Sequence, residues 1–213
     1  MQLTSISATG DKGSYKAQDS VFAVPMNESL LAQAVHVFLN NQRQATSKVK
    51  TRSETNRTKK KWYKQKGTGN ARHGARTPSI FVGGGVAHGP NGEQNWNRSL
   101  SKKMAKQAMR VALSAQAKNI VICDSLERLD GKTGTTAKML KKIIPAAGRI
   151  LVVLAQTEPT IIRGFRNLEM ALTTTSSRVN LYQIAQAHTI LTTTGAIKAL
   201  ETRLQGEEVT AQK

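Results

Sequence analysis

The hydrophobic and polar positions along the chain predict helices and strands on both sides of one long aperiodic stretch. Residues 30–39 place Leu31, Ala34, Val35 and Phe38 on one helical face, and an Asn-Asn-Gln run ends that pattern. Residues 99–118 predict a second helix. Its apolar side chains share one broad arc: Met104, Ala105, Ala108, Met109, Ala112 and Leu113. Between positions 43 and 97 neither a helical nor a strand period is sustained, so this stretch predicts a loop.

Downstream of this second helix, strand-like and helix-like segments alternate. Continuous apolar runs, typical of strands covered on both faces, occupy residues 119–123 and 149–155, and a weaker strand is predicted over 188–194. Helices are predicted over residues 136–144, 160–172 and 195–204. In the helix predicted over 160–172, Ile161, Phe165, Leu168 and Leu172 lie in register.

This alternation predicts an α/β fold, a three-layer domain with a mainly parallel sheet and right-handed crossovers. Residues 1–42 together with 98–205 are expected to form this single globular domain. Residues 43–97 are expected to form a long extended basic loop that interrupts it, and residues 206–213 a flexible C-terminal tail. A loop of this length within a compact domain indicates a function of its own or ordering by a partner.

The charge of the chain is concentrated in and beside this loop. The formal net charge is +19, and the stretch from Arg43 to Arg110 has 17 Lys and Arg against two acidic residues, a net of +15. The rest of the chain has 15 basic and 11 acidic residues, a net of only +4. Because such an excess is best tolerated beside a polyanion, nucleic acid is the favoured partner.

Other functional classes find little support in the sequence. Residues 131–133, GKT, lack the glycine that a phosphate loop requires five residues earlier, where Leu126 stands, so a turn that opens a helix is favoured. The four histidines share no ligand-like spacing with Cys123, which is expected to be a buried small side chain. We therefore expect no enzyme, no cofactor and no metal. The sequence also lacks a secretory signal and an apolar run of membrane-spanning length, which favours an intracellular protein with no membrane partner.

The loop combines residue types that suit RNA. Lys and Arg neutralise phosphates, and glycines let the backbone approach a sugar–phosphate chain. Trp62 and Tyr63 can stack on unpaired bases, and Arg72 and Arg76 offer bidentate donors. In the helix over 99–118 the cations occupy a separate arc, which is either a solvated face or, as the neighbouring loop favours, a phosphate-facing one. The candidate RNA-binding residues are Lys48, Lys50, Arg52, Arg57, Lys59, Lys60, Lys61, Trp62, Tyr63, Lys64, Gln65, Lys66, Gly67, Thr68, Gly69, Arg72, His73, Arg76, Gly83, Gly84, Gly85, Arg98, Lys102, Lys103, Lys106 and Arg110.

Several stretches, in this order, resemble one protein family over nearly the whole chain. They are TRSE (51–54), QKGTGNARHG (65–74), SIFVGGGVAHGP (79–90), KKMAKQAMRVAL (102–113), FRNL (165–168), NLY (180–182) and LTTTGAIKALETRL (191–204). The chain resembles ribosomal protein four of the large subunit, of the bacterial and organellar type. QKGTG-AR followed by GGG is the most specific part of this similarity.

The resemblance implies an α/β domain on the outside of the large subunit and a loop that threads into 23S ribosomal RNA. It also implies a loop tip at the wall of the peptide exit tunnel, near the nascent peptide, neighbouring ribosomal proteins as partners, and a role in early subunit assembly. The expected location is a ribosome, cytoplasmic or organellar. The alternative is a non-ribosomal RNA-binding or RNA-chaperone protein that uses the same loop to anneal RNA. An enzyme of nucleotide metabolism is a more distant alternative.

Overall fold

A computed structural model describes the chain except for residues 8–10, 145–147 and 206–213, so the predicted C-terminal tail lies outside the described residues. The structure divides into two compact units. The first comprises Met1–Phe38 and Ser99–Lys213, and the second comprises Leu39–Arg98.

The first unit contains a six-stranded sheet with the order β2-β1-β3-β6-β4-β5. Its strands are β1 (Gln2–Ile6), β2 (Lys12–Lys16), β3 (Ile120–Ile122), β4 (Ile150–Leu154), β5 (Ala171–Thr175) and β6 (Thr189–Thr192). Strands β1 and β2 pair antiparallel, and every other pair in this sheet is parallel. All five residues of β4 are buried, as expected for an apolar run that is covered on both faces.

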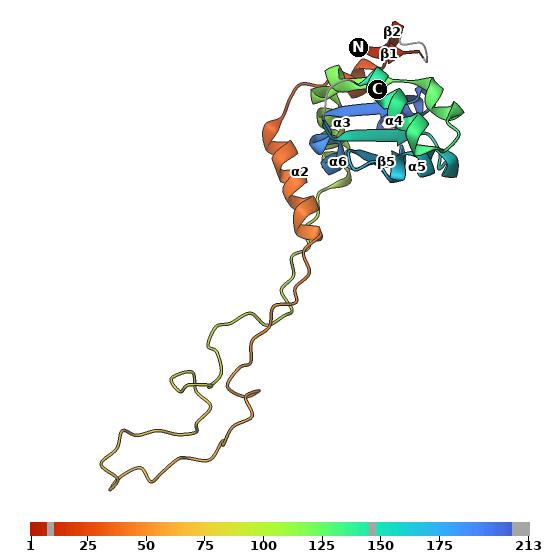
Figure 1. The fold of residues 1–213 in the computed structure, drawn as a ribbon. Coiled ribbons are helices and arrows are strands. Elements are labelled where there is room, and N and C mark those ends of the chain that lie inside the picture. The colour runs from red at the N-terminus through yellow and green to blue at the C-terminus, as the bar shows by residue number, and fades with distance from the viewer. Residues whose placement is uncertain (8–10, 145–147, 206–213) are drawn as a thin grey trace, which may run out of the picture. The chain divides into compact units, whose positions relative to one another are not determined.

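Helices cover both faces of this sheet (Figure 1). They are α1 (Asp19–Phe22), α3 (Lys102–Ala115), α4 (Thr133–Ile143), α5 (Pro159–Arg166), α6 (Leu181–Gln186) and α7 (Thr194–Leu204), with short 3-10 helices at Ala117–Asn119 and Asp124–Arg128. A further helix, α2 (Glu28–Asn41), does not cover the sheet and packs Leu31 against the core. On β4, Leu151 and Val153 pack in one core cluster with side chains of α1, α3, α6 and α7. Val152 and Leu154 pack in a second cluster with side chains of α4 and α5. The predicted three-layer α/β fold is therefore confirmed.

Local signals explain where several helices begin. The Ser101 hydroxyl accepts a hydrogen bond from the Met104 N–H at the start of α3, and Thr193 does the same for Ala196 at the start of α7. Gly131 has φ +74° two residues before α4 begins, and a Cβ there would lie 2.9 Å from the Thr160 carbonyl oxygen. This confirms that GKT forms a turn opening a helix, where backbone conformation and close packing both require glycine.

One predicted helix is too long. The sequence predicted a helix over residues 160–172, whereas α5 ends at Arg166 with Asn167 as its C-cap. Leu172, placed in the helical register with Phe165, belongs to β5 and is 51 % exposed, whereas Phe165 is fully buried. The physical reason lies in the residues ALTTT of β5, since threonine is β-branched and favours an extended chain over a helix.

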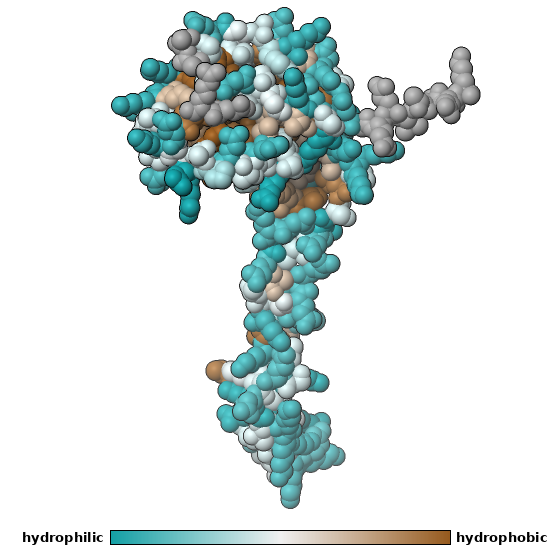
Figure 2. Space-filling view, turned by 90° about the vertical axis from the view of Figure 1, so that its right-hand side faces the viewer, coloured by the Kyte–Doolittle hydropathy of each residue, from teal (hydrophilic) through white to brown (hydrophobic). Residues whose placement is uncertain are grey.

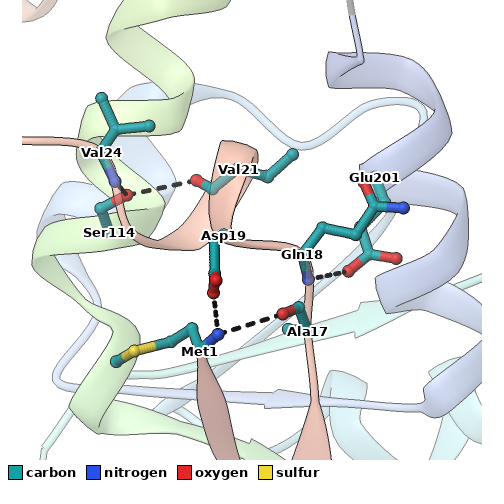
Figure 3. A network of polar contacts seen from close by, with 8 residues as sticks. All are labelled: Met1, Ala17, Gln18, Asp19, Val21, Val24, Ser114 and Glu201. Carbon is teal, nitrogen blue, oxygen red and sulfur yellow. Dashed lines mark hydrogen bonds and ion pairs between the residues drawn. The ribbon is translucent and has the colours of Figure 1, made fainter.

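A network of polar contacts holds residues 17–24 against α3 and α7 (Figure 3). The Gln18 N–H donates to the buried carboxylate of Glu201 on α7 at 2.8 Å. On α3, the Ser114 hydroxyl accepts from the Val24 N–H at 3.0 Å and donates to the Val21 carbonyl at 3.2 Å. These bonds satisfy polar groups of a segment that packs Val21 and Phe22 into the first core cluster and contains only the short helix α1.

Candidate nucleic-acid interface

The second unit is a loop whose two branches are joined by backbone contacts. Residues 42–98, all of which the structure describes, contain no helix or strand and one isolated bridge, between Lys48 and Asn91. The Val49 N–H donates to the Pro90 carbonyl at 3.1 Å, and the Trp62 N–H donates to the Gly74 carbonyl at 3.1 Å. Figure 2 shows the surface of this unit as mainly hydrophilic, with isolated hydrophobic spots. Polar exposure and sparse pairing fit the predicted extended loop.

Four rings cluster near the turn between the two branches. The Trp62 and Phe81 rings meet edge to face with centroids 5.4 Å apart, and the Trp62 and Tyr63 centroids lie 6.0 Å apart. The His73 ring meets the Tyr63 and Phe81 rings edge to face, with centroids 6.5 and 5.1 Å apart. The Arg76 guanidinium lies 4.7 Å from the centre of the Trp62 ring. Trp62 nevertheless remains 49 % exposed, so part of its ring is free to meet a ligand.

The glycines of the loop serve two different purposes. A Cβ on Gly84 would lie 1.9 Å from the Pro78 carbonyl oxygen, and one on Gly85 would lie 2.3 Å from the Arg52 nitrogen. These two glycines therefore allow close packing within the loop. Gly67 and Gly69 have nothing within 4 Å of such a Cβ, but their φ angles are +84° and +67°. They are required for the turn itself, and their surroundings are open.

The predicted cations of the loop differ in how far they are already engaged. Lys48 forms an ion pair with Glu54 at 3.3 Å, and a hydrogen bond from the Thr51 N–H, together with Lys48, lowers the pKa of Glu54. Lys61 donates to the Gln65 side chain. Arg57 is half-buried and donates to the Val82 carbonyl at 2.6 Å. The other cations of the predicted set in this unit are exposed: Lys50, Arg52, Lys59, Lys60, Lys64, Lys66, Arg72, Arg76 and Arg98.

Four further candidates belong to the first unit, on α3. Lys102, Lys103 and Lys106 are exposed. Arg110 is half-buried, and its Nε donates to the Leu204 carbonyl oxygen at the end of α7, at 3.0 Å. A cation at a helix C-terminus satisfies the last carbonyl groups and complements the helix dipole, which gives Arg110 a structural role of its own.

Two aromatic residues of the loop, Phe81 and Trp96, were not among the candidate residues predicted from the sequence. Phe81 contacts both Trp62 and His73, and Trp96 lies under the Arg43 guanidinium at 3.9 Å. A signal for Phe81 was present, because SIFV is the only apolar run in the cationic loop.

No described helix is long and apolar enough to span a membrane. Among the described residues, no group of three or more His, Cys, Asp or Glu side chains could hold a metal ion.

The close packing at Gly85 yields a test of the loop structure. Gly85→Ala is expected to speed hydrogen exchange of the Val86 amide about tenfold, since overpacking costs about 1–3 kcal/mol and this amide donates across the branches to the Lys50 carbonyl. Gly74→Ala is the matched control, because a Cβ there meets nothing within 4 Å. Equal exchange rates in the two variants, measured by NMR, would contradict the packing described here.

Fold and loop together define a class of protein: a three-layer α/β protein with a cationic, glycine-rich insertion. Comparison with known proteins specifies the family. The model of the ribosomal protein L4/L1 family matches residues 15–203. The large ribosomal subunit protein uL4 of Methylobacterium sp. (strain 4-46) is 37 % identical over 201 residues, which cover 92 % of this chain and 95 % of that protein. The uL4 protein of Phenylobacterium zucineum (strain HLK1) is 34 % identical over 212 residues, covering 98 % of this chain and 99 % of its own. The chain belongs to the ribosomal protein L4/L1 family.

Proposed function

We propose that the protein is a structural constituent of the large ribosomal subunit and that its loop binds large-subunit ribosomal RNA. The charge of the loop carries this proposal. Leu39–Arg98 has 13 Lys and Arg residues against two acidic residues, and most of the Lys and Arg side chains are exposed. Such a loop has no apolar core to organise it, and neutralisation of phosphates offsets its self-repulsion. The similarity to proteins named as parts of the large ribosomal subunit supports the same conclusion.

Different side chains of the loop are proposed to contact different parts of the RNA. The exposed cations neutralise phosphates, and the accessible part of the Trp62 ring stacks on an unpaired base. The cations Lys102, Lys103 and Lys106 of α3 add phosphate contacts from the first unit. No role in this proposal requires catalysis or a cofactor.

The tip of the loop is proposed to lie at the wall of the peptide exit tunnel, next to the nascent peptide and neighbouring ribosomal proteins. A branch of about 27 residues spans at most about 90 Å when fully extended, which is long enough to carry the tip deep into a large particle. The proposal also includes a role in early subunit assembly, because a loop enclosed by RNA is most easily placed before that RNA has folded completely.

Co-sedimentation tests the proposed function against its alternative. The protein is expected to stay with large subunits through a high-salt wash, since a folded particle encloses the loop and many contacts must break together. An RNA chaperone that anneals RNA transiently would instead appear in ribosome-free fractions after the same wash. Recovery of the protein only in those fractions would refute the proposed function.

A charge change at the tip tests the tunnel placement. Lys66→Glu and Gly67→Asp are each expected to alter macrolide inhibition of translation while leaving subunit assembly largely intact. Lys66 is exposed, and Gly67 has φ +84°, so each change acts on the tip rather than on the core of the first unit. Gly74→Asp introduces the same charge without a strained φ and is the matched control. Wild-type inhibition curves for both tip variants would place the tip elsewhere.

A further inference from the structure

The second branch of the loop contains a tightly ordered turn at residues 77–85. The Phe81 N–H donates to the Pro78 carbonyl at 3.2 Å, and the Gly84 N–H donates to the Phe81 carbonyl at 2.8 Å. The Gly85 N–H donates to the Thr77 carbonyl, also at 2.8 Å, and this bond joins the two ends of the turn. Thr77 is only 6 % exposed, and Gly85 packs against the Arg52 backbone. This part of the loop is therefore organised by its own contacts.

The same turn presents two aliphatic side chains to solvent. Phe81 contacts Trp62 and His73, whereas its neighbours Ile80 and Val82 are 71 % and 96 % exposed. The Arg57 guanidinium donates a hydrogen bond to the Val82 carbonyl oxygen at 2.6 Å. An ordered turn that holds two apolar side chains in water gains free energy when a partner covers them.

The charge around this turn indicates what covers it. Arg57 lies against Val82 and Gly83, and the Arg52 backbone lies against Gly85. The loop as a whole has 13 basic and two acidic residues, so its partner is a polyanion. In RNA, the surface that accepts an aliphatic side chain is the face of an unstacked base, and folded RNA presents such bases in loops and bulges. Packing of an aliphatic side chain on a base face is physically favourable, as the apolar wedges of minor-groove proteins show in DNA, and in RNA it requires a base that is not already stacked.

We propose that Ile80 and Val82 form an apolar contact with unpaired nucleobases of the bound RNA, while the neighbouring cations meet its phosphates. This inference rests on the proposed function, in which the loop binds ribosomal RNA. It adds a contact whose strength does not depend on salt to an interface dominated by charge.

The distinction between apolar and ionic contacts can be measured. Replacing Ile80 and Val82 by Ser removes no phosphate contact, so the affinity is expected to fall by the same factor at every salt concentration. The slope of log affinity against log salt concentration is then unchanged. Lys60→Gln removes an exposed cation and is expected to reduce that slope by about 0.7–0.9 instead.

The experiment uses the full-length protein with in vitro transcribed large-subunit ribosomal RNA and, separately, with an uninterrupted RNA duplex. The Ile80→Ser/Val82→Ser double variant is expected to bind ribosomal RNA roughly tenfold more weakly, because two aliphatic side chains lose the apolar surface that the RNA covers, and to bind the duplex as the wild type does. The matched control is Met170→Ser/Leu172→Ser, which removes two half-exposed apolar side chains from the first unit, 50 % and 51 % exposed, and is expected to change neither affinity.

Two outcomes would overturn the inference. One is an unchanged affinity for ribosomal RNA; if incorporation into large subunits is reduced at the same time, the turn contacts a protein partner instead. The other is an equal loss on the duplex, which would mean that the side chains act through the conformation of the loop. A wild-type protein that binds ribosomal RNA without a salt slope would overturn the proposed function, and this contact with it.

Discussion

Binding of the protein to ribosomal RNA is expected to weaken by about three to five decades between 50 and 200 mM salt, if about six to ten cations contact phosphates. The loop has enough exposed Lys and Arg side chains to supply that number. Each contact releases counterions that the RNA had condensed, and the gain from that release shrinks as bulk salt rises. Titrations at several salt concentrations give the slope directly.

Deletion of residues 48–76 is the variant that assigns this slope to the loop. It is expected to flatten the salt dependence, because it removes most of the exposed cations of the second unit. Lys102, Lys103 and Lys106 changed together to Gln form the matched control, with a smaller effect expected from three charges. An unchanged slope in the deletion variant would assign the binding to the basic face of α3.

Phe165→Ala is expected to lower the free energy of unfolding by about 3–5 kcal/mol, the usual cost of removing a buried aromatic side chain. Phe165 is fully buried in the cluster formed by α4, α5 and one face of the sheet. The lost burial and the cavity left behind both contribute to this cost. The measurement is urea denaturation of the full-length protein without RNA.

Leu172→Ala is the control for this prediction and tests the end of α5. Because Leu172 lies in β5 and is 51 % exposed, its loss is expected to cost about 0.5 kcal/mol or less, within the usual range for surface substitutions. If α5 continued to residue 172 with both side chains on its buried face, the two variants would be destabilised to a similar degree.

The parts of the fold that could be predicted from the sequence are those with a strong hydrophobic pattern. The predicted strands over 119–123, 149–155 and 188–194 correspond to β3, β4 and β6, which are three adjacent strands of the sheet. Helices α2, α3, α4 and α7 were predicted for the same reason, since one face of each contributes to the core.

The remaining elements lack such a pattern. In β2, KGSYK, four of the five residues are exposed, and the strand depends on pairing with β1 rather than on its own burial. Helix α6 has only six residues, too few to show a helical period. It did have a local signal, the Asn180–Gln183 capping box, in which the Gln183 N–H donates to the Asn180 side chain and the Asn180 N–H donates to the Gln183 side chain. The edge strand β2 is therefore determined by its pairing with β1, whereas the start of α6 has a sequence signal in its cap.

In the candidate site too, composition predicts some features, whereas others depend on contacts that only the structure shows. Charge and glycine content identified the loop and its cations without any structure. Composition could not reveal that Phe81 joins Trp62 to His73, or that Gly84 and Gly85 pack against other backbone of the loop. On α3, a helical wheel grouped Arg110 with three lysines, but only the tertiary structure reveals its bond to the Leu204 carbonyl.

The placement of the loop in ribosomal RNA can be observed in a cryo-electron microscopy map of the intact large subunit. We expect density for the protein in the particle, with residues 43–97 surrounded by ribosomal RNA and their Lys and Arg side chains at hydrogen-bonding distance from phosphates. Large subunits that lack the protein, or a loop that faces solvent without RNA contacts, would contradict it.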